Sequence, residues 1–320
     1  MNRGPAKSCA LHWWKTFDAA CPRGTVTPVK IRLFLLLLVF VALPAYAGLL
    51  PFDTVFQGRD RFDMLVQRAD EENWKALPIG ERACAVGRAL VGTPYRSFTL
   101  EIDDHIEAPS VNLYGFDCWT FFETSLAFAR MLNEPRQDWT PSELLHYIEL
   151  DRYRGGHCTG EYLSRLHYLE DWLYDNDRRG LVRNMTRSLG GIRVAHEASE
   201  MSAGWREYRY LRADPSLLVP LREMEDRVES QTFYEIPKSR VPAVEAKLQD
   251  GDIIGVTTRE DGVISTAHVG MAYRDGMGVL HFMHASSPHN FGRVVIDDRL
   301  SNYLNRYPSD AGIIVGRPLI

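Results

Sequence analysis

The sequence contains little cysteine. Only five of its 320 residues are Cys, and no two of them form a C-x-x-C pair. A disulfide-stapled scaffold needs a higher cysteine density, and a cysteine-rich zinc site needs closely spaced ligands. The sequence therefore argues against both classes of protein.

Basic clusters and long apolar runs are also missing. The formal net charge is −5 and no block of Lys and Arg occurs, so the electrostatic signature of a nucleic-acid-binding protein is absent. The longest apolar run, Leu33 to Leu43, is too short for a comfortable membrane span. We therefore expect a globular protein with no nucleic-acid partner.

The short apolar run has the features of a secretory signal peptide. Lys30 and Arg32 precede it, and Pro44-Ala45-Tyr46-Ala47 follows it with an A-x-A end. We expect residues 1–47 to be removed, leaving residues 48–320 as a single exported domain, periplasmic or secreted, without a stable membrane anchor. An uncleaved signal anchor is the alternative, and N-terminal sequencing of the exported protein distinguishes the two.

The region before the apolar run is long for a signal peptide, which suggests an over-extended start, with translation beginning near Val26 or Val29. Removing residues 1–47 takes away six basic residues, one acidic residue and two cysteines. The mature chain then has 31 Lys and Arg against 41 Asp and Glu, a net charge of −10, and three cysteines. An odd number leaves at least one free thiol in a monomer, the oligomeric state that we expect.

Hydrophobic spacing predicts an α+β fold. Apolar residues recur at helical spacing within 62–69, 83–90, 161–175 and 217–230, and Thr140-Pro141-Ser142-Glu143 is typical of a helix start. Short apolar or alternating runs bounded by turn residues predict strands at Ile253–Thr257, Val269–Tyr273, Val279–His284, Val294–Ile296 and Ile313–Val315. A helical N-terminal half would then pack on a C-terminal antiparallel sheet.

One cysteine has a setting that suits catalysis. Cys118 follows Gly115-Phe116-Asp117, and the apolar spacing after it predicts a helix over residues 119–132. A thiol at a helix N-terminus is favoured as thiolate, which is the nucleophilic form. A buried structural cysteine is the alternative. Cys84 is expected in the core, with a Cys84–Cys158 disulfide left open.

A histidine pair could serve that thiol. His268 and His284 flank a hairpin turn near Asp275-Gly276-Met277. If the turn is centred on Gly276, the two imidazoles lie directly opposite each other on one face, whereas a two-residue turn would put them on different faces. Such a pair would supply a base and its orienting partner, and His281 should point away.

Six segments carry a resemblance to a known family, which covers roughly residues 80–318. They are FDCWTFFETSLAFAR, YLSRLHYLEDWLYDN, DGDIIGVTT, AHVGMAYRDGMGVLHFMHASS, VVIDDRLSNYL and GIIVGRP. Together they resemble the N-acetylmuramoyl-L-alanine amidase-like family of the NlpC-type papain-like cysteine hydrolases, which cut bacterial peptidoglycan. Trp119-Thr120 stands where the broader superfamily has Ser-Gly after its cysteine, so the usual D-Glu–diamino acid endopeptidase specificity is not carried over from the resemblance.

The resemblance implies a papain-like NlpC-type fold and roles for several residues. Cys118 would be the nucleophile, His268 the general base and His284 its orienting partner, with Tyr95 beside them. Arg165 is a candidate to bind a stem-peptide carboxylate, with an exposed helical arginine as the alternative.

Three further residue assignments concern the surroundings of that site. Tyr168 lies in the same segment as Arg165 and is a candidate for substrate binding. Asp117 could bind a substrate amine, but we prefer a role as helix cap. The stretch Glu101–Glu107 is expected to be a solvated loop.

The predicted function is hydrolysis of the amide between N-acetylmuramic acid and L-Ala, in peptidoglycan or soluble muropeptides, by a Cys-His-His mechanism without cofactor or metal. The acidity of the mature chain favours soluble fragments over an anionic wall. An endopeptidase that cuts the D-Glu–diamino acid bond and a non-catalytic peptidoglycan-binding module are the alternatives. A zinc hydrolase using His268, His281 and His284 is disfavoured, because 281 and 284 should face opposite ways.

Overall fold

The computed structural model describes residues 50–260 and 262–320. The predicted signal peptide and start site lie outside these residues. The chain divides into the units Met1–Ala45 and Tyr46–Ile320, and all described residues belong to the second. No helix in the described ranges is long and apolar enough to cross a membrane.

Most α-helices lie in the N-terminal part of this unit, and the last two lie among the C-terminal strands. The α-helices are α1 (Phe52–Val55), α2 (Arg59–Glu71), α3 (Ile79–Ala89), α4 (Cys118–Met131), α5 (Pro141–Arg152), α6 (Leu169–Arg178), α7 (Glu200–Ala203), α8 (Arg209–Ala213), α9 (Leu218–Glu229), α10 (Val241–Val244) and α11 (Leu300–Arg306). The 3₁₀ turns are η1 (Trp74–Ala76), η2 (Arg136–Asp138), η3 (Arg154–Gly156), η4 (Tyr162–Ser164), η5 (Trp205–Glu207), η6 (Pro215–Leu217), η7 (Lys238–Arg240) and η8 (Glu245–Lys247).

The C-terminal part forms an antiparallel sheet. The strands of the described chain are β1 (Phe56–Gln57), β2 (Val111–Asn112), β3 (Val182–Asn184), β4 (Ile192–Val194), β5 (Phe233–Pro237), β6 (Ile253–Glu260), β7 (Val263–Arg274), β8 (Leu280–Ala285), β9 (Val294–Arg299) and β10 (Asp310–Pro318). The large sheet has the order β4-β5-β10-β6-β7-β8-β9, with β3 also paired to β10. All of these neighbouring strands pair antiparallel.

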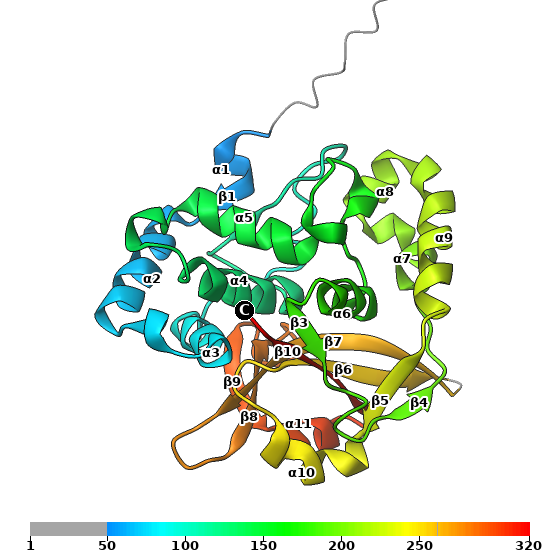
Figure 1. Cartoon of the computed structure of the whole chain (residues 1–320). Coiled ribbons are helices and arrows are strands. Elements are labelled where there is room, and N and C mark those ends of the chain that lie inside the picture. Colours follow the sequence, from blue (N-terminus) through cyan, green and yellow to red (C-terminus); the bar gives the residue numbers. More distant parts are fainter. Residues whose placement is uncertain (1–49, 261) are drawn as a thin grey trace, which may run out of the picture. The chain divides into compact units, whose positions relative to one another are not determined.

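The sheet is covered on both faces. Figure 1 shows α3, α4 and α6 on one side of it and α10 and α11 on the other. Successive residues of a strand point to opposite faces of the sheet and so pack against different helices. Met271 belongs to the core with α4, whereas Ala272 belongs to the core with α11. A third, smaller core links α7, α8 and α9 with Tyr162 and Tyr168. The α+β class predicted from the sequence is confirmed.

Most predicted elements are present. In α2 the buried residues are Phe62, Leu65, Val66 and Ala69, the face expected from their spacing. Pro141 opens α5, and its N-cap Thr140 accepts a hydrogen bond from the Glu143 amide at 3.2 Å. The five predicted strands correspond to β6–β10; β6, β7, β9 and β10 are longer than predicted, whereas β8 has the predicted length and begins one residue later.

The predicted helix over 161–175 is wrong in its first half. Only the turn η4 forms there, the chain is extended at Arg165 and Tyr168, and α6 begins at Leu169. Arg165 pairs with Tyr153 in an isolated β-bridge, and the Leu166 amide donates to the Arg152 carbonyl at 2.9 Å. These long-range partners replace the intrahelical hydrogen bonds, and a local apolar pattern cannot reveal them. The short strands β3, β4 and β5 were not predicted either.

Candidate active site

Cys118 is the first residue of α4. Its predecessor Asp117 is the N-cap, accepting a hydrogen bond from the Thr120 amide at 2.8 Å while the Asp117 amide donates to the Thr120 hydroxyl at 3.1 Å. The second carboxylate oxygen of Asp117 accepts from Thr99 at 2.9 Å. The preferred reading of Asp117 as a helix cap is therefore confirmed, and the cap holds the thiol at the helix N-terminus.

His268 on β7 and His284 on β8 are in contact. His268 Nε2 and His284 Nδ1 are 2.7 Å apart, with the two rings nearly perpendicular. The hairpin pairs Met271 with Met283, so its centre lies one residue later than predicted. His284 therefore lies opposite Gly270, and His268 is its diagonal neighbour on the same face. The predicted direct opposition is wrong, while the shared face is confirmed.

Gly270 makes room for this contact. A Cβ atom at position 270 would lie 2.6 Å from the Met283 carbonyl oxygen and 2.8 Å from the His284 Cβ. Both distances are shorter than real Cβ contacts allow, so any larger residue would displace β8 and the imidazole that it carries. The glycine thus permits the diagonal approach of His284 to His268.

An aspartate that the sequence reading missed completes the histidine chain. Asp297, on β9, lies 3.4 Å from His284 Nε2 and forms an ion pair of 2.7 Å with Arg306 of α11. Burial opposes its ionisation, but hydrogen bonds from His284 and Arg306 hold the pKa of Asp297 well below its usual range. Asp297 lies in the segment VVIDDRLSNYL, which carries part of the family resemblance, and this could have drawn attention to it. Its spacing in the sequence, however, does not indicate that it contacts His284.

This arrangement assigns the protons on both rings. Burial lowers the pKa of His284, so its imidazole is neutral, and the ionised Asp297 can only accept a hydrogen bond. His284 must therefore carry its proton on Nε2 and accept one from His268 through Nδ1. His268 then carries its proton on Nε2, which leaves its Nδ1 free to accept another.

The resting thiol and imidazole are both neutral. Burial and the Asp117 charge raise the pKa of Cys118 to about 12, against the lowering effect of the amides of Val269, Trp119 and Cys118. Burial and His284 lower the pKa of His268 to about 3. Desolvation thus opposes the thiolate expected at the helix N-terminus, and no hydrogen bond joins Cys118 to His268 in the described structure.

Two clefts meet around the thiol. The Cys118 cleft, about 380 Å³, is lined by Cys118 and His268 together with Glu170, Glu200 and Thr266. The Tyr95 cleft, about 340 Å³, is lined by Tyr95, Asp117 and Arg165 among others. Both clefts share four lining residues, namely Trp119, His167, Met201 and Tyr208. Apart from His284, which contacts His268 from behind, the sequence-predicted site residues therefore line one continuous region.

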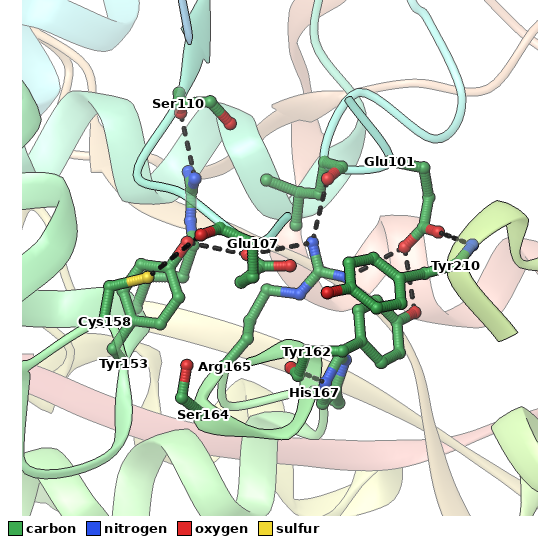
Figure 2. A network of polar contacts seen from close by, with 12 residues as sticks. Glu101, Glu107, Ser110, Tyr153, Cys158, Tyr162, Ser164, Arg165, His167 and Tyr210 are labelled. Atoms are coloured by element: carbon green, nitrogen blue, oxygen red, sulfur yellow. Dashed lines mark hydrogen bonds and ion pairs between the residues drawn. The ribbon is translucent and has the colours of Figure 1, made fainter. Parts of the chain in front are cut away.

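Arg165 has a different setting from the predicted one. Its side chain is 4% exposed, forms an ion pair of 2.8 Å with Glu101 and lies 3.8 Å from Glu107. It also donates to the Leu100 carbonyl at 3.1 Å and stacks over the Tyr162 ring. Figure 2 shows the guanidinium enclosed between the two carboxylates. Its charge is paired inside the protein, so the exposed helical arginine is wrong, while binding of a substrate carboxylate stays a prediction because Arg165 also lines the Tyr95 cleft.

The prediction of a solvated loop over Glu101–Glu107 is wrong at both ends. The side chains of Glu101 and Glu107 are about 6% and 5% exposed, because each is drawn toward Arg165. Glu107 also accepts a hydrogen bond of 2.7 Å from Tyr153, as Figure 2 shows. Only the middle of the stretch is solvated, where Asp104 pairs with Arg209 on the surface.

The remaining candidates have structural partners. The Tyr168 hydroxyl donates to Glu225 at 2.7 Å and accepts from the Met201 amide at 3.2 Å, so only its ring faces the Cys118 cleft. Cys84 and Cys158 are free thiols rather than a disulfide. Cys84 is buried in α3 as expected, and its thiol donates to the Ala272 carbonyl.

No metal cluster forms around the histidines. His281 bonds to the Asp297 carbonyl through Nδ1 and to Asp275 through Nε2, away from the His268–His284 contact. Within residues 50–260 and 262–320, no three His, Cys, Asp or Glu side chains converge as metal ligands. The geometry of the described residues offers no support for the zinc alternative.

Comparison with protein families identifies the fold and its relatives. The model of the N-acetylmuramoyl-L-alanine amidase-like family matches residues 85–313, most of the chain. The chain belongs to this family. Cys118, His268, His284 and Asp297 all lie inside the matched range of the amidase-like model.

Solved structures agree with this membership. An N-acetylmuramoyl-L-alanine amidase from Bacteroides uniformis is 29% identical, with a TM-score of 0.66, over 76% of this chain and 99% of its own. A Bacteroides fragilis protein provisionally described as a xylanase is 32% identical, with a TM-score of 0.65, over 72% and 98%. A Legionella pneumophila protein, 19% identical with a TM-score of 0.61, shares the fold over 82% and 95%. Among curated proteins, no sequence matches this chain.

Proposed function

We propose that this amidase-like protein is a cysteine hydrolase that cleaves the amide between N-acetylmuramic acid and L-Ala in peptidoglycan or its soluble fragments. The observation that carries the proposal is a helix-capped thiol and His268 lining one cleft, with His284 in contact with His268 behind it. Family membership and the amidase among its structural neighbours support the bond. We also propose that the protein is one of the NlpC-type papain-like hydrolases.

The reaction begins with a neutral thiol beside a neutral imidazole. As Cys118 Sγ attacks the amide carbonyl, its proton passes to His268 Nδ1, the nitrogen left free by the chain to Asp297. The oxyanion forms at the start of α4, where the Cys118 amide can donate to it. Substrate thus meets a general base rather than a preformed thiolate.

The second half of the reaction returns the proton. Protonated His268 donates it to the departing amine of L-Ala, while the lactyl group of the sugar stays on Cys118 as a thioester. A water molecule, deprotonated by His268, then attacks the thioester carbonyl and releases the carboxylate and the thiol. Electrons and protons balance over the cycle, and hydrolysis of one amide consumes one water.

Product analysis tests the proposed bond. Incubation of the mature protein with N-acetylmuramoyl peptides is expected to release an intact peptide with a free L-Ala amine, detected by mass spectrometry. Cleavage inside the peptide would favour the endopeptidase instead. Binding without any cleavage would favour the non-catalytic module.

Asp297 is expected to act as a positioning residue for the histidine pair. Asp297→Asn keeps the size of the side chain but lets it donate to His284 Nε2, which reverses the proton order along the chain. We expect kcat to fall by about 10²-fold to 10⁴-fold, with KM little changed and an altered pH profile. Steady-state kinetics across pH measures this effect.

The neighbouring Asp298 provides the matched control. It is exposed, lies 4.0 Å from Arg306 and makes no hydrogen bond to His284 among the described residues. Asp298→Asn should retain near-normal kcat. Equal losses in the two variants would contradict the positioning role, as would an Asp297→Asn enzyme with full activity.

The export prediction remains part of the proposal. Peptidoglycan lies outside the cytoplasmic membrane, so a cleaved signal peptide would bring the enzyme to its substrate.

A further inference from the structure

Two carboxyl side chains line the Cys118 cleft without a matching cation among the described residues. Glu170, in the first turn of α6, and Glu200, at the start of α7, both line it. Among the described residues no Lys or Arg lines the cleft, and its two histidines, His167 and His268, are kept neutral because burial lowers their pKa values. Neither glutamate forms an ion pair within the described residues.

Glu170 is the more buried of the two. It is 7% exposed, and Thr266 donates a hydrogen bond to its Oε1. Its other carboxylate oxygen, Oε2, has no hydrogen-bond partner among the described residues although the residue lines the cleft. Glu200 is exposed and also lines the cleft. One wall of the cleft therefore offers a desolvated carboxylate with an unused acceptor and a second carboxylate near it.

Such an arrangement is costly without a ligand. Burial raises the pKa of Glu170 to about 7, and the charge of Glu200 adds to the effect. An isolated buried carboxylate is poorly solvated, and a bound cation would stabilise its ionised form. The rings of Trp119, Tyr168 and Tyr208 also line the cleft, and aromatic faces attract cations. A ligand that brought a carboxylate to this wall of the cleft would instead be repelled by Glu170 and Glu200.

We infer that Glu170, assisted by Glu200, binds a protonated primary amine on the peptide part of the substrate. This inference rests on the proposed function, because it takes the molecule entering the Cys118 cleft to be a muramoyl peptide. The amine would approach Glu170 Oε2, and the Thr266 hydrogen bond would hold the carboxylate in place. Glu170 is then a specificity-determining residue, which selects peptides with a free side-chain amine.

The test compares two ligands that differ only in that amine. The first is N-acetylmuramoyl-L-Ala-D-isoglutamyl-L-lysine, and the second is the same compound acetylated on the lysine side chain. Affinity is measured by calorimetry with the Cys118→Ala protein, so that no ligand is consumed. We expect the free amine to bind about tenfold more tightly or better, as suits a charge-assisted hydrogen bond.

Glutamine variants made in the Cys118→Ala protein show which carboxylate causes the preference for the free-amine ligand. Glu170→Gln can still accept the Thr266 hydrogen bond but carries no charge, so it should bind the two ligands almost equally, while its affinity for the acetylated ligand stays unchanged. Glu200→Gln, at an exposed position, should reduce the preference partially and provides a second test if Glu170→Gln folds poorly. Glu207→Gln is the matched control, because Glu207 is exposed and lies outside the lining of the cleft.

Several outcomes overturn the subsite. These are equal affinity of the unmodified cleft for both ligands, no binding of either, or an equal loss for both ligands in Glu170→Gln. Incubating the wild-type protein with the same two compounds separates this result from the proposed function. Cleavage of the muramoyl amide without amine preference would remove only the subsite, whereas amine-selective binding without cleavage would remove only the proposed activity.

Discussion

Replacing Cys118 by alanine is expected to lower kcat for muramoyl amide hydrolysis by at least about 10⁴-fold, which is the scale seen when a covalent nucleophile is removed. The substitution removes the sulfur that would carry the thioester, and no other thiol of the described residues lines either cleft. Alanine is a good helix former, so α4 should begin at the same residue. Initial rates at saturating substrate measure the loss, and thermal unfolding measures the fold.

Cys158 gives the matched control for this substitution. It is a free, half-buried cysteine whose thiol donates to the Glu107 carbonyl at 3.5 Å, outside the lining of both clefts. Cys158→Ala should therefore leave kcat within about twofold of wild type, because Cys158 contacts none of the proposed reacting groups. Turnover by Cys118→Ala at more than a tenth of the wild-type rate would rule out the thioester mechanism.

Replacing Arg165 by alanine is expected to destabilise the protein by about 3–5 kcal/mol at pH 7, because it leaves two buried carboxylates without their cation. Arg165 holds the loop with Glu101 and Glu107 against the segment between α5 and α6, and the Tyr95 cleft is built on this contact. Denaturant unfolding of the purified variant measures the loss. An unchanged unfolding free energy with a raised KM would instead support Arg165 as a substrate ligand.

The size of this loss should depend on pH in a definite direction. Burial already raises the pKa of Glu107, and removing Arg165 would raise it further in the folded state. A raised folded-state pKa favours the folded protein only at pH values low enough for the carboxyl to be protonated. The stability difference between variant and wild type should therefore shrink as the pH falls from 7 toward 4.5.

An exposed ion pair provides the comparison for Arg165. Arg209 and Asp104 form a surface pair, each with nearly half of its side chain exposed. Such pairs contribute about 0–1 kcal/mol, so Arg209→Ala should have a small effect at every pH. A similar loss in both variants would mean that burial of the Arg165 cluster is not the cause.

Local sequence patterns predicted those features that depend on neighbouring residues. The cap at Asp117, the thiol at the first position of α4 and the buried face of α2 all follow from spacing within a few turns of helix. The same patterns failed over 162–168, where the segment is held by Arg152, Tyr153 and Glu101 rather than by its own backbone. Long-range partners of this kind leave no periodic signal.

Patterns in the amino-acid sequence were enough to predict the α+β class, the positions of the main strands, the helix start at Cys118 and the family whose model matches the chain. The way in which these parts meet depends on contacts between distant segments. Strand register made His284 a diagonal rather than a direct neighbour of His268, and β9 brought Asp297 behind it. Burial also determined the charges of Cys118 and His268. The helix terminus favours a thiolate, but desolvation of the site outweighs this effect and keeps both groups neutral.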